Sequence, residues 1–128
     1  DSSTSRGLGD VYKRQYHGRM LNIHPSLLPQ FKGINTHERA IEAEVAEHGA
    51  SVHFVSSELD GGPMVLQASV SVLSLDSPKV LAARVLVQEH LIYPIAIKWF
   101  CEGRLKLQNN AVLMDGQLLP EQGIQFQS

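Results

Sequence analysis

The stretch ASVHFVSSELDGGPMVLQASVSV, residues 50–72, decides the fold class. Apolar residues recur at every second position of Met64–Val72, which is typical of a strand with one buried face. Residues 50–57 are rich in valine and phenylalanine and also favour a strand. Between the two runs, ELDGGP combines an aspartate, two glycines and a proline, which indicates a turn. We therefore predict a hairpin with a long tip.

Upstream of this hairpin, the sequence predicts one short strand and one helix. RMLNI, residues 19–23, favours a strand that leads into a loop. NTHERAIEAEVAEHG, residues 35–49, favours a helix with Asn35 as N-cap, Glu38 in a box-like position and Gly49 as its stop.

Downstream, residues 76–103 form the longest helix signal in the chain. Ser77 is the expected cap, with Pro78 at the first helical position and Gly103 at the end. Pro94 is expected to kink or split this helix, because proline removes a backbone donor. Residues 104–120 then predict a short hairpin that turns at Asn109-Asn110 and is followed by a polar tail.

The predicted order is strand, helix, strand, strand, long helix, strand. This order indicates an α/β fold with some antiparallel pairing. A chain that enters at a strand with polar residues at its end resembles the final part of a larger open sheet. Ligands of such sheets bind beyond the carboxyl ends of the strands.

Composition excludes several classes of protein. The 128 residues suffice for one domain, and 43% of them are apolar, which favours a globular body over disorder. A formal charge of −2 predicts no nucleic-acid partner and no anionic membrane surface. The most apolar stretch, Val80–Phe100, is interrupted by five polar residues, so no membrane span is expected. Cys101 is the single cysteine, which excludes an internal disulfide and favours a cytoplasmic location.

The first fifteen residues, DSSTSRGLGDVYKRQ, differ from the rest of the chain. They show no apolar period and no signal-peptide pattern. We interpret residues 1–15 as a non-native or disordered leader, and residues 16–128 as one domain that begins within its fold.

The segment NIHPSLLPQFKG, residues 22–33, carries the first candidate chemistry. In an extended segment, side chains at positions i and i+2 face the same way, so Asn22 and His24 point toward one place. An amide can donate to an oxyanion, and an imidazole can act as acid, base or polariser. Taken alone, the spacing favours an ordinary loop asparagine beside an incidental histidine.

Other polar residues are weaker candidates. Asp60 lies in the loop tip, where aspartate is common, and contact with His24 would give it a role in orienting the imidazole. Glu89 and His90 interrupt an apolar helix and need a polar environment or a ligand. No histidine pair has helical ligand spacing and no cysteine set accompanies the histidines, so no metal is expected.

Three motifs together resemble a known family. The chain resembles phosphoribosylglycinamide formyltransferase, the glycinamide ribonucleotide transformylase of purine synthesis, in three motifs and in their order and spacing. These motifs are NIHPSLLPQFKG, HGASVHFVSSELDGGPMVLQ and QEHLIYP. The resemblance runs from about Arg19 to Asn110. It implies the carboxyl-terminal half of a Rossmann-like formyltransferase fold, an α/β fold whose mixed sheet is flanked by helices.

The resemblance also implies a reaction and its residues. A formyl group would pass from 10-formyltetrahydrofolate to the amine of glycinamide ribonucleotide, in de novo purine (IMP) biosynthesis, without a metal. Asn22, His24 and Asp60 match the catalytic residues of the family, and Glu89 matches a residue that contacts the ribonucleotide. The positions that match the folate-binding part are Leu21, Ile23, Ser57, Glu58, Leu59 and Gly61.

Departures from the family leave alternatives open. The amino-terminal half with its glycine-rich phosphate loop has no counterpart here, and Leu86 stands where some members carry a polar phosphate contact. We therefore expect this chain to be less active than a complete relative. Formyltetrahydrofolate deformylase is the main alternative, although it usually has a second histidine where this chain has Pro25. An inactive folate-binding fragment is another.

A second related enzyme, methionyl-tRNA formyltransferase, fits less well, because it adds a basic carboxyl-terminal domain. The predicted first strand would also expose an unpaired edge, which invites aggregation or a homodimer.

Overall fold

The computed structural model describes residues 20–56 and 61–127 and shows an α/β fold. The elements follow the predicted order. In chain order they are β1 (Leu21–His24), α2 (Thr36–Glu42), β2 (Glu47–Phe54), β3 (Met64–Ser71), α3 (Pro78–Cys101), β4 (Leu105–Gln108), β5 (Ala111–Met114), β6 (Gln117–Leu118) and β7 (Ile124–Gln125).

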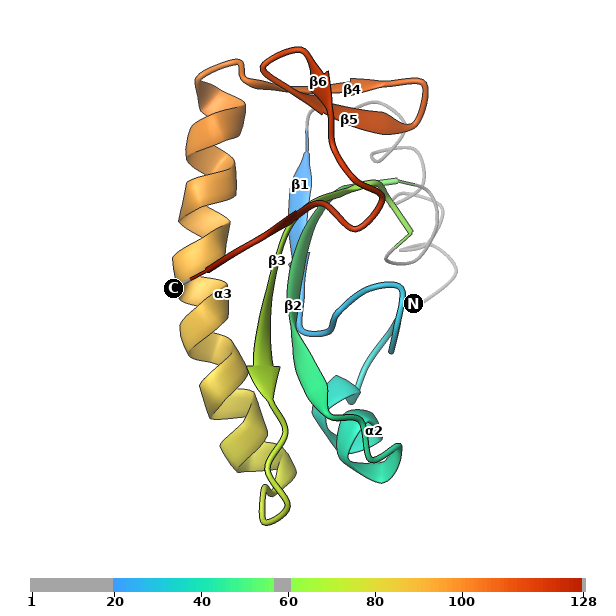
Figure 1. Cartoon of the computed structure of the whole chain (residues 1–128), viewed down its shortest axis with the longest axis vertical. Helices are drawn as coiled ribbons and strands as arrows, with labels where there is room; N and C mark the ends of the chain where they lie inside the picture. Colours follow the sequence, from blue (N-terminus) through green and yellow to red (C-terminus); the bar gives the residue numbers. More distant parts are fainter. Residues whose placement is uncertain (1–19, 57–60, 128) are drawn as a thin grey trace, which may run out of the picture.

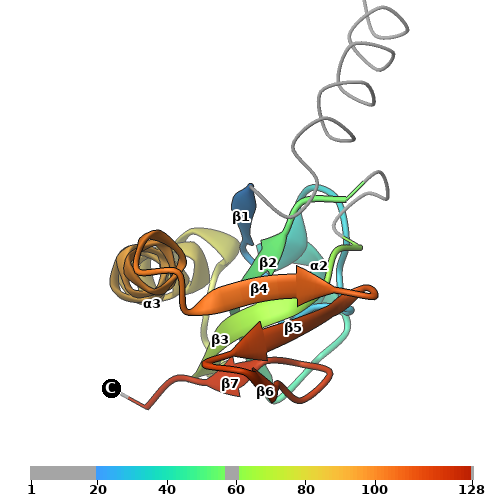
Figure 2. The same ribbon diagram turned by 90° about the horizontal axis from the view of Figure 1, so that it is seen from above.

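The main sheet is mixed, with the strand order β1-β2-β3-β7 (Figure 2). β1 pairs antiparallel with β2, and β2 pairs antiparallel with β3, which confirms the predicted hairpin. β7 pairs in parallel with β3 at the opposite edge from β1. A second sheet, β4-β5-β6, lies at one end of the molecule, and α2 lies at the other (Figure 1).

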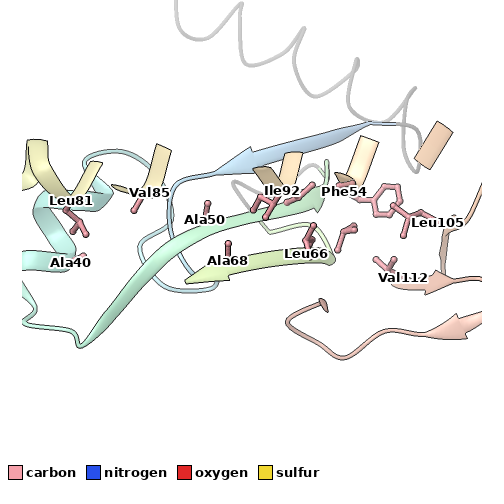
Figure 3. Packing of buried hydrophobic residues seen from close by; sticks show 13 residues of the cluster. Ala40, Ala50, Phe54, Leu66, Ala68, Leu81, Val85, Ile92, Leu105 and Val112 are labelled. Carbon is pink, nitrogen blue, oxygen red and sulfur yellow. The ribbon is translucent and has the colours of Figure 1, made fainter. Parts of the chain in front are cut away.

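The hydrophobic core lies between α3 and one face of the main sheet. Val52 and Phe54 of β2 and Leu66 of β3 are almost fully buried against the α3 side chains Leu81 and Ile92. Burying a side chain of this size contributes about 1.5–3 kcal/mol. The buried residues form a continuous band from the α2 end to the β4–β5 end (Figure 3). This band leaves the other face of β1, β2 and β3 available for polar side chains.

The predicted helix over residues 35–49 is too long. α2 ends at Glu42, and Gly49 lies inside β2 rather than at a helix stop. A Cβ atom at Gly49 would lie 1.9 Å from the carbonyl oxygen of Ala68, so glycine is needed there for close approach of two strands. Asn35 does occupy the N-cap position, but with a φ of 56° and without a side-chain cap hydrogen bond.

The long helix agrees better with its sequence signals. The Ser77 side chain accepts a hydrogen bond from the Val80 amide over 3.2 Å, and Gly103 follows the helix with a φ of 75°. Pro94 does not split α3, which is continuous from Pro78 to Cys101. Pro94 has no N–H to donate to the carbonyl of His90, four residues earlier. Both residues are exposed, so water can donate to that carbonyl instead.

The prediction that no stretch could span a membrane is wrong on length and composition. α3 contains an 18-residue window with a mean hydropathy of 1.4, of which 22% is buried. The interrupting polar residues do not lower the hydropathy enough to exclude the helix. The same helix supplies Leu81, Val85, Ile92 and Ala96 to the core, as the core helix of a globular domain does.

The carboxyl-terminal part contains one confirmed turn and two missed strands. β4 and β5 pair around Asn109 and Asn110, whose φ angles of 51° and 63° fit a tight hairpin turn. The predicted hairpin has a third strand, because Gln117–Leu118 joins β5. The prediction of a polar tail after residue 120 is wrong, because Ile124–Gln125 joins β3. Two-residue strands carry too little pattern for detection in the sequence.

Candidate functional site

The two faces of β1 differ in chemistry. Asn22 and His24 lie opposite His53 and Ser51 of β2, so these four side chains share the face that points away from α3. Asn22 is exposed, whereas His24 is only 5% exposed. The strand geometry therefore brings Asn22 and His24 to one face, as the i, i+2 spacing predicts.

The folate-wall candidates Leu21 and Ile23 lie on the other face of β1. Both are half-buried and pack against the hydrophobic core. Leu21 also accepts a hydrogen bond from the Tyr93 hydroxyl through its carbonyl oxygen, over 3.4 Å. A ligand on the Asn22 face would therefore meet these two residues through their backbone.

His24 is held by the loop that follows it. Its Nε2 atom lies 2.8 Å from the Phe31 carbonyl oxygen, and because a carbonyl only accepts, Nε2 carries the hydrogen. Phe31 has a φ of 53°, which is unusual for a bulky residue. Its ring lies edge-to-face with His48 at 6.0 Å, and the Arg39 guanidinium lies 5.5 Å from the ring centre. The loop thus orients the imidazole.

A pair of imidazoles, His37 and His48, lies next to Phe31. His37 Nδ1 and His48 Nε2 are 3.2 Å apart, and His48 is 1% exposed. Burial lowers the pKa of His48 to about 4, with smaller contributions from His37 and His24. Burial also lowers the pKa of His37. Burial therefore favours the neutral form of both rings.

The Glu89 carboxyl lies within electrostatic reach of His24. Burial raises the pKa of Glu89, and the charges of His90 and His24 act in the opposite direction. Glu89 is half-buried on α3, whereas His90 is exposed. One predicted ribonucleotide contact, on α3, is therefore coupled electrostatically to the predicted catalytic imidazole on β1.

The remaining predicted residues belong to the loop between β2 and β3. Ser57, Glu58, Leu59 and Asp60 lie outside the described residues. Gly61 is described and leads into Gly62 and Pro63. The Pro63 carbonyl accepts from the Phe54 amide over 2.9 Å, and a Cβ at Gly62 would lie 1.6 Å from the Phe54 carbonyl oxygen. Gly62 and Pro63 therefore lie tightly against the end of β2.

A cavity of about 570 Å³ lies beside this stem. Its walls come from Leu28 and Pro29, from Gly61–Met64 and from the β5–β6 region. Neither Asn22 nor His24 lines it, so it is distinct from the face that carries the candidate chemistry. Within residues 20–56 and 61–127, no three metal-ligating side chains gather in one place.

Sequence reasoning missed several buried polar residues around His24. Ser26, Ser51 and Gln67 are each at most 3% exposed. Gln67 falls in an apolar strand, and a glutamine there is a signal of internal hydrogen bonding that the sequence does contain.

The chain belongs to the formyl transferase family, whose sequence pattern matches residues 6–97. Among curated relatives, phosphoribosylglycinamide formyltransferase of Escherichia coli strain K12 is 55% identical over 118 residues, which are 92% of this chain and 56% of that protein. A solved phosphoribosylglycinamide formyltransferase of Coxiella burnetii is 49% identical, with a TM-score of 0.88, covering 93% of this chain and 56% of that one.

A formyltetrahydrofolate deformylase from Pseudomonas syringae is a more distant structural neighbour. It is 28% identical, with a TM-score of 0.78, and the match covers 82% of this chain and 35% of that one. The family resemblance and the α/β fold expected from the sequence are thus confirmed. The chain spans about half the length of the Escherichia coli relative and of the phosphoribosylglycinamide formyltransferase of Haemophilus influenzae.

Proposed function

We propose that this chain carries part of the site that transfers a formyl group from 10-formyltetrahydrofolate to the amine of glycinamide ribonucleotide, in purine biosynthesis. The observation that carries the proposal is the pairing of Asn22 and His24 on one face of β1, within a chain 55% identical to a phosphoribosylglycinamide formyltransferase. An amide donor beside an imidazole suits the carbonyl oxygen of a formyl group, which becomes an oxyanion during acyl transfer.

The proposed reaction has two stages. The amine of the ribonucleotide attacks the formyl carbon, which forms a carbon–nitrogen bond and a tetrahedral oxyanion. The bond from that carbon to the folate nitrogen then breaks, and the proton lost by the amine passes to the folate nitrogen. Asn22 would donate to the oxyanion from its amide. Removing one such donor typically costs about 3–4 kcal/mol of transition-state stabilisation.

His24 needs a second ring hydrogen to take part as a donor. Its Nε2–H is already directed at the Phe31 carbonyl over 2.8 Å. Donation from Nδ1 at the same time requires the imidazolium form, in which both nitrogens carry hydrogen. A carboxylate favours that form, and Asp60, outside the described residues, is the candidate.

Substrate contacts are proposed for a second set of residues. The half-buried carboxyl of Glu89, on α3 and within electrostatic reach of His24, suits the hydroxyl groups of a ribonucleotide. The backbone of Leu21 and Ile23, together with residues Ser57, Glu58, Leu59 and Gly61, would contact the folate. No resident metal is proposed, and neither nucleic acid nor membrane is proposed as a partner.

An assay with and without the acceptor amine tests this proposal against hydrolysis. Formation of tetrahydrofolate from 10-formyltetrahydrofolate that depends on glycinamide ribonucleotide supports transfer. Release of formate without the acceptor supports a deformylase, the activity named for the Pseudomonas syringae neighbour. Folate binding that survives His24→Ala, with neither product, supports a non-catalytic binding fragment.

We also infer that the chain forms a homodimer and is cytoplasmic. β1 is the edge strand of the described sheet, and α3 exposes apolar side chains at Leu86, Val87 and Leu91. A second copy would cover both features. Sedimentation velocity tests this inference, since Leu86→Lys together with Leu91→Lys should shift the dimer toward monomer. The inference is contradicted if the unsubstituted chain sediments as a monomer at about 100 μM, a concentration at which even a weak dimer would form.

A further inference from the structure

A row of polar side chains crosses all four strands of the main sheet. The strand register aligns His24 of β1 with Ser51 of β2, Ser51 with Gln67 of β3, and Gln67 with Gln125 of β7. Gln67 Nε2 donates to Ser51 Oγ over 2.9 Å, and Gln125 Nε2 donates to Gln67 Oε1 over 3.0 Å. Polar residues in successive register positions therefore form one connected layer that ends beside His24.

The inner members of this layer also bind the loop that follows His24. Ser51 Oγ donates to the Ser26 carbonyl over 2.7 Å and accepts from the Leu28 amide over 3.1 Å. Gln67 Nε2 donates to the Leu28 carbonyl over 3.0 Å. Two side chains thus satisfy three backbone groups of a loop that has no strand partner of its own.

The other side of this loop is fixed by contacts with α2. Thr36 Oγ1 donates to the Pro25 carbonyl over 2.6 Å, and Arg39 Nη1 donates to the Lys32 carbonyl over 2.6 Å. Between these anchors, Ser26 Oγ donates to the Gln30 carbonyl over 2.6 Å. The path from Ser26 to Phe31 is therefore determined at both ends, and Phe31 is the residue whose carbonyl accepts from His24.

The burial of these groups makes the layer sensitive to single substitutions. Ser51 is fully buried and Gln67 is 3% exposed, so water cannot replace a missing partner. Leaving a buried backbone group without a partner is costly, whereas a fully satisfied buried network is rigid.

We propose that Ser51 and Gln67 are positioning residues that set the orientation of His24 by clamping the Ser26–Leu28 segment to the sheet. The layer acts through the loop: Gln67 holds Leu28, the loop carries Phe31, and the Phe31 carbonyl holds the His24 ring. The role in formyl transfer rests on the proposed function, because it matters for catalysis only if His24 acts on the formyl group.

The test is Gln67→Met in the 128-residue chain, with Gln125→Met as its matched control. Methionine keeps the length of glutamine and removes its donor. Gln125 lies in the same layer but touches Gln67 rather than the loop. Two quantities are measured by NMR: hydrogen exchange of the Leu28 and Gln30 amides relative to the centre of β2, and the ¹⁵N signature of the His24 ring at a pH where the ring is neutral.

We expect Gln67→Met to raise loop exchange at least about tenfold relative to β2 and to turn a single Nε2–H form of His24 into a mixture of tautomers. Gln125→Met should change neither quantity, and Ser51→Ala should act like Gln67→Met. Unchanged loop exchange and an unchanged His24 signature in Gln67→Met would overturn the proposal, and so would equal effects in the two methionine variants. Absence of formyl transfer in the unsubstituted chain contradicts the proposed function and not the clamp.

Discussion

The imidazole of His24 donates from Nε2 to the carbonyl oxygen of Phe31 over 2.8 Å, across a loop of six intervening residues. Phe31 presents that carbonyl with a positive φ of 53°. The carbonyl that orients the candidate catalytic ring therefore belongs to a residue with an unfavourable backbone conformation. The contacts of the Phe31 ring with His48 and Arg39 support this conformation.

This conformation predicts the relative stability of two variants. Phe31→Gly and Phe31→Ala both lose the ring contacts with His48 and Arg39, but only glycine adopts a positive φ without cost. We expect the free energy of unfolding of the glycine variant to exceed that of the alanine variant by about 1 kcal/mol. Urea unfolding measures this difference, and the glycine variant should unfold at the higher urea concentration. Equal stability of the two variants would show that the φ of residue 31 carries no strain.

His48 predicts a loss of stability in acid. Burial, and then the neighbouring His37 and His24, lower its pKa from 6.5 to about 4 in the folded chain. Between these two values the unfolded chain binds more protons, so stability is full above pH 6.5 and falls as the pH drops toward 4. The loss can reach about 3 kcal/mol.

Urea unfolding at pH 7.5, 6 and 5 measures this loss. His48→Phe keeps an aromatic ring against Phe31 and removes the titrating group, so its stability should depend less on pH over that range. The burial of His37 lowers its pKa in the same direction and leaves a residual slope. An identical pH dependence in His48→Phe and the unsubstituted chain rules out His48 as the source.

Gly62 predicts a large effect of one methyl group. Its Cβ would lie 1.6 Å from the Phe54 carbonyl oxygen, which forces the stem of the β2–β3 loop to move. We expect Gly62→Ala to cost at least about 2 kcal/mol. Gly103→Ala is the control, because Gly103 has open space and only its φ of 75° opposes a side chain, which costs about 1 kcal/mol.

The comparison uses thermal unfolding of both variants. If Gly62→Ala is no more destabilising than Gly103→Ala, the loop stem is not tightly apposed to β2.

Local signals in the sequence predicted most of the secondary structure. The alternation in Met64–Val72 and the Ser77-Pro78 start of α3 both correspond to observed elements. Gly49 was misassigned as a helix stop because its real constraint, the nearby Ala68 carbonyl, comes from another strand. The tolerance of α3 for Pro94 likewise depends on which side of the helix faces solvent.

The candidate site was only partly predictable for the same reason. The i, i+2 spacing of Asn22 and His24 is a local property of a strand, and the structure has both on one face. The contacts of Ser51 and Gln67 with the loop join residues far apart in the chain, and no spacing rule reports them. The predicted role of Asp60 stays a prediction, because Asp60 lies outside the described residues.

Glu89 predicts a selective loss of acceptor binding. Glu89→Gln keeps the size of the side chain and removes its charge, so we expect the KM for glycinamide ribonucleotide to rise by at least about tenfold, equivalent to about 1.4 kcal/mol. The KM for 10-formyltetrahydrofolate should stay within about twofold, and Glu102→Gln, an exposed carboxyl after α3, serves as the control. Equal changes in both KM values would contradict a direct contact with the acceptor.

The central claim is that Asn22 and His24 together hold the formyl oxygen. The most direct test is the rate of ribonucleotide-dependent formyl transfer, measured for the unsubstituted chain, Asn22→Ala and the control Asn110→Gly in the β4–β5 turn. The proposal predicts transfer by the unsubstituted chain and by Asn110→Gly, with a rate about 10²–10³ lower for Asn22→Ala. Equal rates for Asn22→Ala and the unsubstituted chain would contradict it.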